Sequence, residues 1–338
     1  MGSQPKPRDG ATSRSNPAIA EPIRVSAGIE YIVKRTNRLH TAGVAILIVA
    51  VAISCTGCAD KPDWRVTDDG ILEYNKPAPG SDYRLRTLEE TDNYTLCEVT
   101  YESRGAVIEG LIRMPKTAAG KGKSVPGVVL LPGATVTKEG EQGLARYLES
   151  IGYASITIDQ RNLGGIDMEA DLEMFLSGVE PIEHRMVYDA LFAAEVLRKQ
   201  PNVDPDRIAY LGESNGGRFA IIAYALDSDA LGVVAISTCG YGIDAAVAAG
   251  RIRDPEAIRF YRSIDPDTYL SSIRPHHRPG KFVMIHSLND PIIGYENAQA
   301  TYIAAGWRKS LHTIETEGHG YSAEMNPFLE SELAEIFS

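Results

Sequence analysis

A serine between glycines stands near the middle of the chain, in the segment Gly212-Glu213-Ser214-Asn215-Gly216-Gly217. A serine hydroxyl is a weak nucleophile, so an enzyme that uses one presents it on a sharp turn beside a base. The apolar run Ile208–Leu211 precedes this segment and predicts a strand, and Arg218–Leu226 follows it and predicts a helix. Glycines two residues before and after the serine let the strand and the helix pass closely. The pattern therefore predicts a nucleophile elbow that presents Ser214.

An aspartate and a histidine follow the serine in chain order, each on a loop after a predicted strand. The apolar run Lys281–Ser287 ends just before Asp290, and Lys309–Ile314 ends just before His319, which lies between two glycines. Parallel strands end at the same edge of a sheet, so both loops should lie beside the elbow. We expect His319 to take the proton of Ser214 and Asp290 to orient His319.

The other histidines and acids fit these roles less well. A catalytic base must reach both a serine and a carboxylate from a loop, whereas His286 and His312 fall within predicted strands. The remaining histidines lie in a proline-flanked loop, at the start of a helix and before an apolar N-terminal run: His276, His277, His184 and His40. Asp265 and Asp267 are weak rivals to Asp290.

Five segments together resemble the α/β-hydrolase superfamily, and within it the dienelactone hydrolase and prolyl-oligopeptidase-like branch. In chain order they are Pro132-Gly133, Asp159–Gly165, Gly212–Gly217, Asn289-Asp290-Pro291 and Gly318-His319-Gly320. The resemblance covers about Tyr94 to the C-terminus. It implies a serine hydrolase with a Ser-Asp-His triad and an acyl-enzyme intermediate.

The resemblance also implies which groups form the oxyanion hole. The donors would be the backbone N–H groups of Ala134 and Asn215. Pro132 stands where the superfamily usually has histidine, but backbone contacts do not depend on that side chain. We interpret Asp159-Gln160-Arg161-Asn162, which looks like the family's Asp-x-Arg-Gly stretch, as a loop-fixing ion-pair network near the site.

The order of predicted elements favours the same fold independently of the motifs. From Val125 onward, short apolar strands alternate with amphipathic helical patterns, which is typical of a mostly parallel sheet with helices on both faces. Tyr94–Tyr101 and Val107–Arg113 predict an antiparallel hairpin at the edge of this sheet. Residues 237–280 interrupt the alternation and predict a small cap over the site. Aromatic side chains of this cap line a pocket or form the cap's own core: Tyr241, Phe260, Tyr261 and Tyr269.

Composition excludes several other classes of function. The net charge is −11, and the sequence has neither a basic stripe nor a phosphate-binding glycine loop, so no nucleic-acid partner is expected. Cys55 and Cys58 lack a second pair of ligands, so the sequence predicts no metal site and no cofactor.

The N-terminal part of the chain predicts export and a membrane tether. Residues 1–32 indicate a disordered leader or a segment upstream of the true start. Residues 33–59 combine basic residues, a short apolar run and Thr56-Gly57-Cys58, which resembles a lipobox with Cys58 as the lipidated residue and Cys55 as second choice. An uncleaved membrane anchor is the alternative reading. Residues 60–92 are expected to be a tether to a catalytic domain at 93–338, outside the cytoplasm.

The substrate is less well defined by the sequence than the chemistry. The chain before residue 93 is too short for the β-propeller that precedes prolyl-oligopeptidase domains, so a carboxylic ester is favoured over a peptide as substrate. A peptidase or aminoacyl-amide hydrolase is the alternative within the same chemistry. A non-catalytic binding protein on a hydrolase scaffold is the alternative outside it. The expected partner is a small-molecule or peptide acyl substrate.

Overall fold

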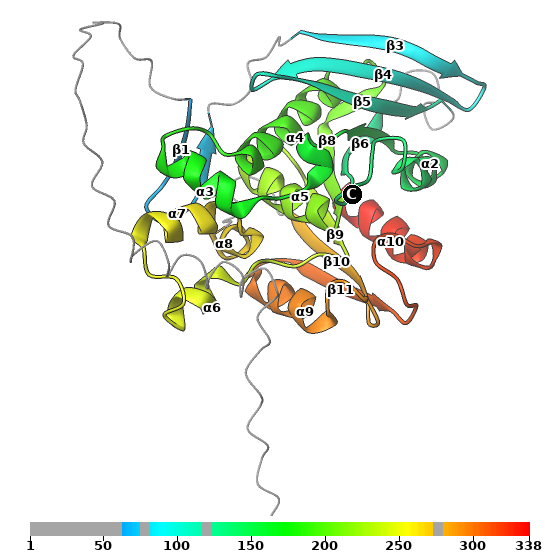
Figure 1. The fold of residues 1–338 in the computed structure, drawn as a ribbon. Helices are drawn as coiled ribbons and strands as arrows, with labels where there is room; N and C mark the ends of the chain where they lie inside the picture. The colour runs from blue at the N-terminus through cyan, green and yellow to red at the C-terminus, as the bar shows by residue number, and fades with distance from the viewer. Residues whose placement is uncertain (1–62, 75–81, 117–123, 273–279) are drawn as a thin grey trace, which may run out of the picture.

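The computed structural model describes residues 63–74, 82–116, 124–272 and 280–338 (Figure 1). The proposed lipidation residues Cys58 and Cys55, the leader and the export segment lie outside these ranges. Among the described residues, no helix is both long and apolar enough to cross a membrane. The membrane tether therefore stays a prediction from the sequence.

A nine-stranded sheet forms the centre of the described part of the chain. Strands β11, β10, β9, β8, β6 and β7 pair in parallel, and β5, β4 and β3 continue the sheet in antiparallel fashion. In spatial order the strands are β11 (Lys309–Ile314), β10 (Lys281–Ser287), β9 (Gly232–Ile236), β8 (Val203–Glu213), β6 (Val125–Leu131), β7 (Ala154–Ile158), β5 (Ala106–Pro115), β4 (Tyr94–Ser103) and β3 (Tyr83–Glu90).

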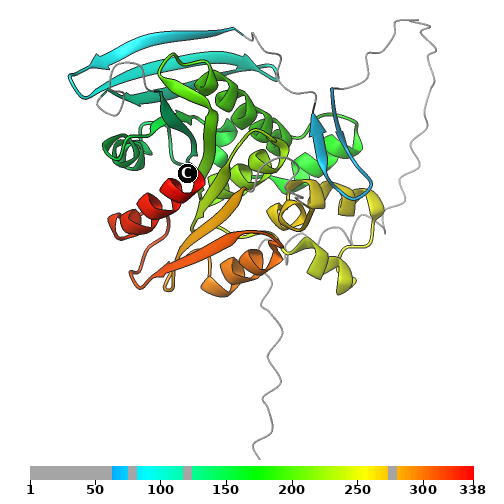
Figure 2. The ribbon, with the colours of Figure 1, turned by 180° about the vertical axis from the view of Figure 1, so that it is seen from behind.

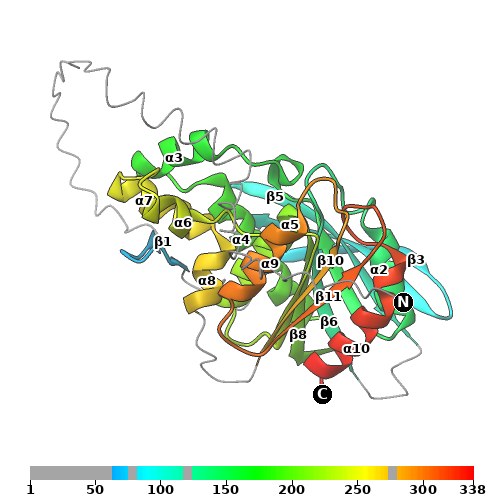
Figure 3. The same ribbon diagram turned by 90° about the horizontal axis from the view of Figure 1, so that it is seen from below.

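Helices cover both faces of this sheet, because its central strands carry apolar side chains on both faces. Strands β6, β7, β9 and β10 are buried along their whole length, as expected for parallel strands between two helix layers. Figure 3 shows α2 and α10 on one side of β6 and β8, and α4, α5 and α9 on the other. These helices are α2 (Gln142–Ser150), α4 (Ile182–Arg198), α5 (Asn215–Leu226), α9 (Tyr295–Ala304) and α10 (Asn326–Ile336). The predicted α/β-hydrolase architecture is confirmed.

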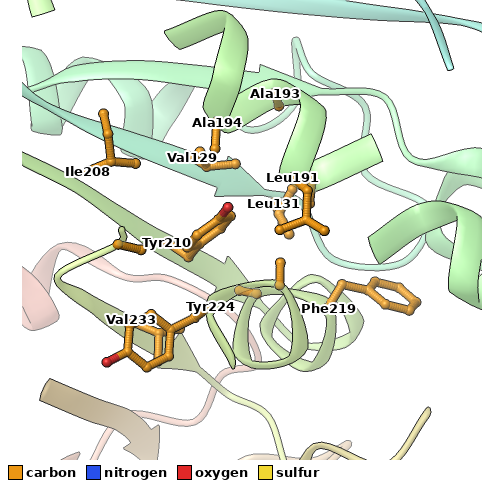
Figure 4. Packing of buried hydrophobic residues seen from close by; sticks show 14 of the residues in the cluster. Val129, Leu131, Leu191, Ala193, Ala194, Ile208, Tyr210, Phe219, Tyr224 and Val233 are labelled. Carbon is orange, nitrogen blue, oxygen red and sulfur yellow. The ribbon is translucent and has the colours of Figure 1, made fainter. Parts of the chain in front are cut away.

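The larger of the two apolar layers lies under α4 and α5. Figure 4 shows Val129 and Tyr210, from neighbouring strands, in the same cluster as Leu191 of α4 and Phe219 of α5. All four side chains are buried. At about 25 cal/mol per Å² of apolar surface, burying side chains of this size stabilises the fold by about 1.5–3 kcal/mol each. This layer holds α5, and with it the elbow, against the sheet.

The predicted hairpin is present, but the segment before it was wrongly predicted to be a tether. Within residues 60–92 the structure contains β1 (Trp64–Val66) and β2 (Leu72–Tyr74), which pair with each other, and β3, which adds an outer strand to the hairpin. The side chains of β3 are mostly exposed on both faces, so its sequence lacks the apolar alternation that reveals a strand. Leu72, in contrast, is fully buried in the main core.

The cap is larger than the sequence indicated. Helices α6 (Ile243–Ala248), α7 (Pro255–Ile264) and α8 (Pro266–Ser272) follow β9, and α7 packs against α3 (Met168–Leu176) from an earlier part of the chain. The β1–β2 ribbon lies beside this group of helices (Figure 2). All four aromatic residues of the predicted cap are buried, three of them in one cluster with Phe175 of α3. These three form the cap's own core, which was one of the two predicted roles, whereas Tyr269 packs in the main core.

The Asp159–Asn162 stretch is a loop-fixing network, as predicted. Lys138 donates to Asp159 from both its backbone N–H, at 2.7 Å, and its Nζ, at 2.6 Å. Gln160 donates to the carbonyl oxygen of Pro132. Arg161 forms a two-point ion pair with the buried Asp189 of α4, at 2.7 and 3.0 Å. Three consecutive side chains thus hold the loops after β6 and β7 in place.

The Arg161–Asp189 ion pair predicts a measurable loss of stability. Arg161→Met leaves a buried carboxylate without its cation, so we expect the free energy of unfolding to fall by about 3–5 kcal/mol in urea denaturation followed by circular dichroism. Arg86→Met, which breaks an exposed pair with Glu98, is the control and should cost less than about 1 kcal/mol. Equal losses in the two variants would contradict the role given to Arg161.

Candidate active site

Ser214 lies on a strained turn between β8 and α5. Its backbone has φ 50° and ψ −119°, an uncommon conformation for a residue with a side chain. Its N–H donates to Ile236 of β9 at 2.9 Å, and its carbonyl oxygen accepts from the hydroxyl of Thr238 at 2.6 Å. Strand β9 and the segment that follows it therefore bind the turn on both its N–H and its carbonyl group, and the predicted elbow geometry is present.

The loop after β6 packs directly against this turn. At Gly216, an added Cβ would overlap the carbonyl oxygens of Leu131 and Pro132, so the backbones touch there only because the residue is glycine. On the other side of the contact, a Cβ on Gly133 would lie 3.5 Å from the Cβ of Ser214. The start of α5 and the Pro132-Gly133-Ala134 loop thus pack directly against each other next to the serine.

The structure brings Asp290 and His319 together as predicted. The Nδ1 of His319 lies 2.9 and 3.0 Å from the two carboxylate oxygens of Asp290. Burial raises the pKa of Asp290, but hydrogen bonds from the N–H of Ile293, from His319 and from the N–H of Ile292 outweigh it, so the pKa is lowered overall. The ionised carboxylate fixes the proton of His319 on Nδ1 and leaves Nε2 as a proton acceptor.

The loop that carries the histidine is tied to the elbow by a backbone hydrogen bond. The N–H of Tyr321 donates to the Glu213 side chain at 2.9 Å. Tyr321 lies two residues after His319, and Glu213 lies directly before Ser214. The two loops that carry the proposed nucleophile and base are therefore joined at this end of the sheet.

Three of the rival residues, His184, His312 and Asp265, have structural partners elsewhere. The ring of His184 pairs with Ser263 at 2.7 Å, and that of His312 with Glu332 at 2.6 Å. Asp265 accepts from the N–H groups of Tyr241 and Ile243 in the cap. His40, His276 and His277 lie outside the described residues.

Two backbone N–H groups near the elbow are already hydrogen-bonded and are therefore not available as oxyanion donors. The N–H of Ser214 is used by Ile236, and the N–H of Thr135 donates to Leu163 at 2.6 Å. Asn215 is the first residue of α5, where the backbone N–H has no acceptor within the helix. Together with Ala134, on the loop that touches the elbow, it remains the predicted donor.

An asparagine–arginine contact, which the sequence did not indicate, connects the elbow to two other loops. The side chain of Asn215 donates to the carbonyl of Gly164 at 3.1 Å and accepts from the guanidinium of Arg218. Arg218 also donates from Nε to the carbonyl of Cys239 at 2.7 Å. Arg218 thus holds the side chain of Asn215 in position and binds the first residues of the cap. The sequence feature that could have revealed this contact is an arginine within an otherwise apolar helix.

The turn that receives Asn215 is itself strained. Asn162, Leu163 and Gly164 have φ values of 51°, 49° and 70°, so three consecutive residues adopt the left-handed conformation. Such strain persists only where the surroundings impose it, and here the bonds to Thr135 and Asn215 do so. The turn holds the oxyanion loop on one side and the elbow on the other.

Comparisons with known proteins assign the chain to a family. A family model described as acetyl xylan esterase (AXE1) matches residues 80–271, a range that contains Ser214 and ends before Asp290 and His319. An uncharacterised protein of Mycobacterium tuberculosis strain H37Rv is 31% identical over 124 residues, which is 37% of this chain and 39% of that protein. The chain thus spans about two fifths of the length of this curated relative.

Solved structures share the fold at low sequence identity. The acetyl xylan esterase from Paenibacillus sp. R4 is 18% identical with a TM-score of 0.62, over 76% of this chain and 89% of that one. The glucuronoyl esterase from Solibacter usitatus is 12% identical with a TM-score of 0.58, over 82% and 90%. At this identity the likeness establishes the α/β-hydrolase fold.

The contact at Gly216 predicts a specific loss of activity. Gly216→Ala pushes the oxyanion loop away from the elbow, so we expect ester hydrolysis to fall by about a hundredfold or more, comparable to losing one oxyanion donor. Gly143→Ala in α2 is the control, because an added Cβ there meets nothing within 4 Å. Hydrolysis rates and circular dichroism of the two folded variants test this. Full activity of Gly216→Ala would contradict the contact.

Proposed function

Because the chain belongs to the acetyl xylan esterase family, we propose that it is a serine hydrolase that cleaves carboxylic esters. The observation that carries the proposal is the Asp290–His319 pair at 2.9 Å, on a loop joined to the elbow of Ser214. A buried, ionised carboxylate paired with an imidazole, on a loop joined to the turn of a strained serine, is the arrangement that nucleophilic acyl transfer requires.

The proposed reaction begins with acylation of the serine. The Oγ of Ser214 attacks the ester carbonyl carbon while Nε2 of His319 takes its proton. The N–H groups of Asn215 and Ala134 stabilise the negative oxygen of the tetrahedral intermediate. The C–O bond to the alcohol then breaks, and His319 returns the proton to the leaving oxygen. The acyl group remains as an ester on Ser214.

Water completes the proposed cycle by the same route. His319 takes a proton from a water molecule, whose oxygen attacks the acyl carbon, and the same two N–H groups hold the second oxyanion. Collapse of this intermediate releases the carboxylic acid and returns the proton to Ser214. Asp290 stays ionised throughout and stabilises the imidazolium of His319 in both steps.

Short acyl groups, acetate foremost, are the proposed acyl part of the substrate. Support for this comes from the family, whose description names acetyl xylan. A series of p-nitrophenyl esters from acetate to decanoate, run beside aminoacyl and prolyl amides, measures the preference. Fastest turnover of acetate supports the proposal, whereas faster cleavage of the amides favours a peptidase.

Loss of the serine hydroxyl should abolish turnover. Ser214→Ala is expected to reduce kcat for p-nitrophenyl acetate by at least about a thousandfold, the usual cost of losing a triad nucleophile. Ser150→Ala, at an exposed serine of α2, should leave kcat unchanged. In the wild-type protein, a fluorophosphonate should form an adduct that peptide mapping locates on Ser214. A folded protein that forms no adduct would overturn the proposal and favour a binding role.

A further inference from the structure

Two glutamate side chains, those of Glu141 and Glu213, contact each other next to the proposed catalytic loops. Glu213 precedes Ser214 on the elbow, and Glu141 lies at the end of the loop that begins with Pro132, directly before α2. Their carboxyl groups are joined by a side-chain hydrogen bond. Glu213 also accepts the N–H of Tyr321 at 2.9 Å. The pair therefore connects the oxyanion loop, the elbow and the histidine loop at one point.

The histidine loop is shaped to receive this carboxylate. Gly320 lies between His319 and Tyr321 and has φ 89°, a conformation that favours glycine. An added Cβ at Gly320 would lie 2.6 Å from Oε2 of Glu213. The carboxylate thus occupies the space that a side chain would fill, and the loop rests on Glu213 through backbone atoms.

One of the two glutamates must be protonated, since two carboxylates in hydrogen-bond contact repel each other. Glu141 is 5% exposed, and burial together with the neighbouring Glu213 raises its pKa well above the ordinary value. Within the described part of the chain, Oε1 of Glu141 has no hydrogen-bond partner. Glu141, the more deeply buried of the two, is therefore assigned as the neutral donor to Glu213.

We propose that Glu213 is a positioning residue for the base His319, acting through the Tyr321 N–H, and that Glu141 holds Glu213 in place as a neutral hydrogen-bond donor. The proposal rests on the proposed function, since it assigns His319 as the base. The position of the histidine loop matters because a displacement of a catalytic group by about 1 Å can lower the reaction rate about a hundredfold.

Substitutions at Glu141 test whether its role is to donate a hydrogen bond or only to fill space. Glu141→Gln keeps a neutral donor of the same shape, so kcat should stay within about twofold of the wild type. Glu141→Leu removes the donor, so we expect kcat to fall by about tenfold or more while KM changes little. Rescue by glutamine but not by leucine distinguishes a directed hydrogen bond from packing.

The double variant tests whether Glu141 acts through Glu213. Glu213→Ala should lower kcat by about ten- to a hundredfold, and adding Glu141→Leu should cause no further loss, because its only proposed effect is already absent. Losses that multiply would overturn the proposal. Retention of full kcat by Glu213→Ala would also overturn it.

Rates are expressed per active site, titrated with a fluorophosphonate, so that unfolded protein does not enter kcat. The rate of phosphonylation should fall in parallel with kcat, since both need the same base. If the wild-type protein forms no adduct on Ser214, the proposed function fails. If the wild type is labelled and the glutamate variants react at the wild-type rate, only the positioning role fails.

Discussion

The backbone contact between the start of α5 and the loop after β6 is the constraint on which the proposed site depends. At Gly216 the two segments are so close that a single added carbon atom would overlap two carbonyl oxygens. Gly133, the residue before Ala134, comes so close to the elbow that its added Cβ would lie 3.5 Å from the Cβ of Ser214. An oxyanion hole made of backbone N–H groups needs such an approach, since a side chain between the loops would separate the donors. The polar contacts of the surrounding loops keep these two segments together.

Buried charges keep the loops in place around that contact. Lys138–Asp159 and Arg161–Asp189 fix the segments after β6 and β7, and Arg218 fixes the turn after β9. Each of these contacts joins a loop to an element that the apolar core already holds. Apolar packing alone tolerates small shifts, whereas a directed, charge-assisted hydrogen bond fixes both distance and angle. The core therefore determines the fold, and the polar contacts determine the positions of the loops.

The sequence predicted elements where apolar periodicity was strong and missed them where it was weak. Strands β10 and β11 have the predicted bounds, and every residue of β10 is buried. Strand β3 was missed because both its faces are exposed. The Ser-Asp-His order indicated the candidate residues, since loops after parallel strands share an edge. The contacts of Asn215 and Glu213 could not be predicted, because they join segments far apart in the chain.

The surroundings of Asp290 decide which of two histidines it orients. His286 Nε2 lies 3.8 Å from Asp290, against 2.9 Å for Nδ1 of His319. Burial lowers the pKa of His286, although its hydrogen bond to the carbonyl of Ile293 acts in the opposite direction. A neutral His286 does not compensate the charge of Asp290. In the proposed mechanism that charge remains available to His319, whose side chain is partly exposed. In this proposal the carboxylate orients only one imidazole, although two imidazoles lie near it.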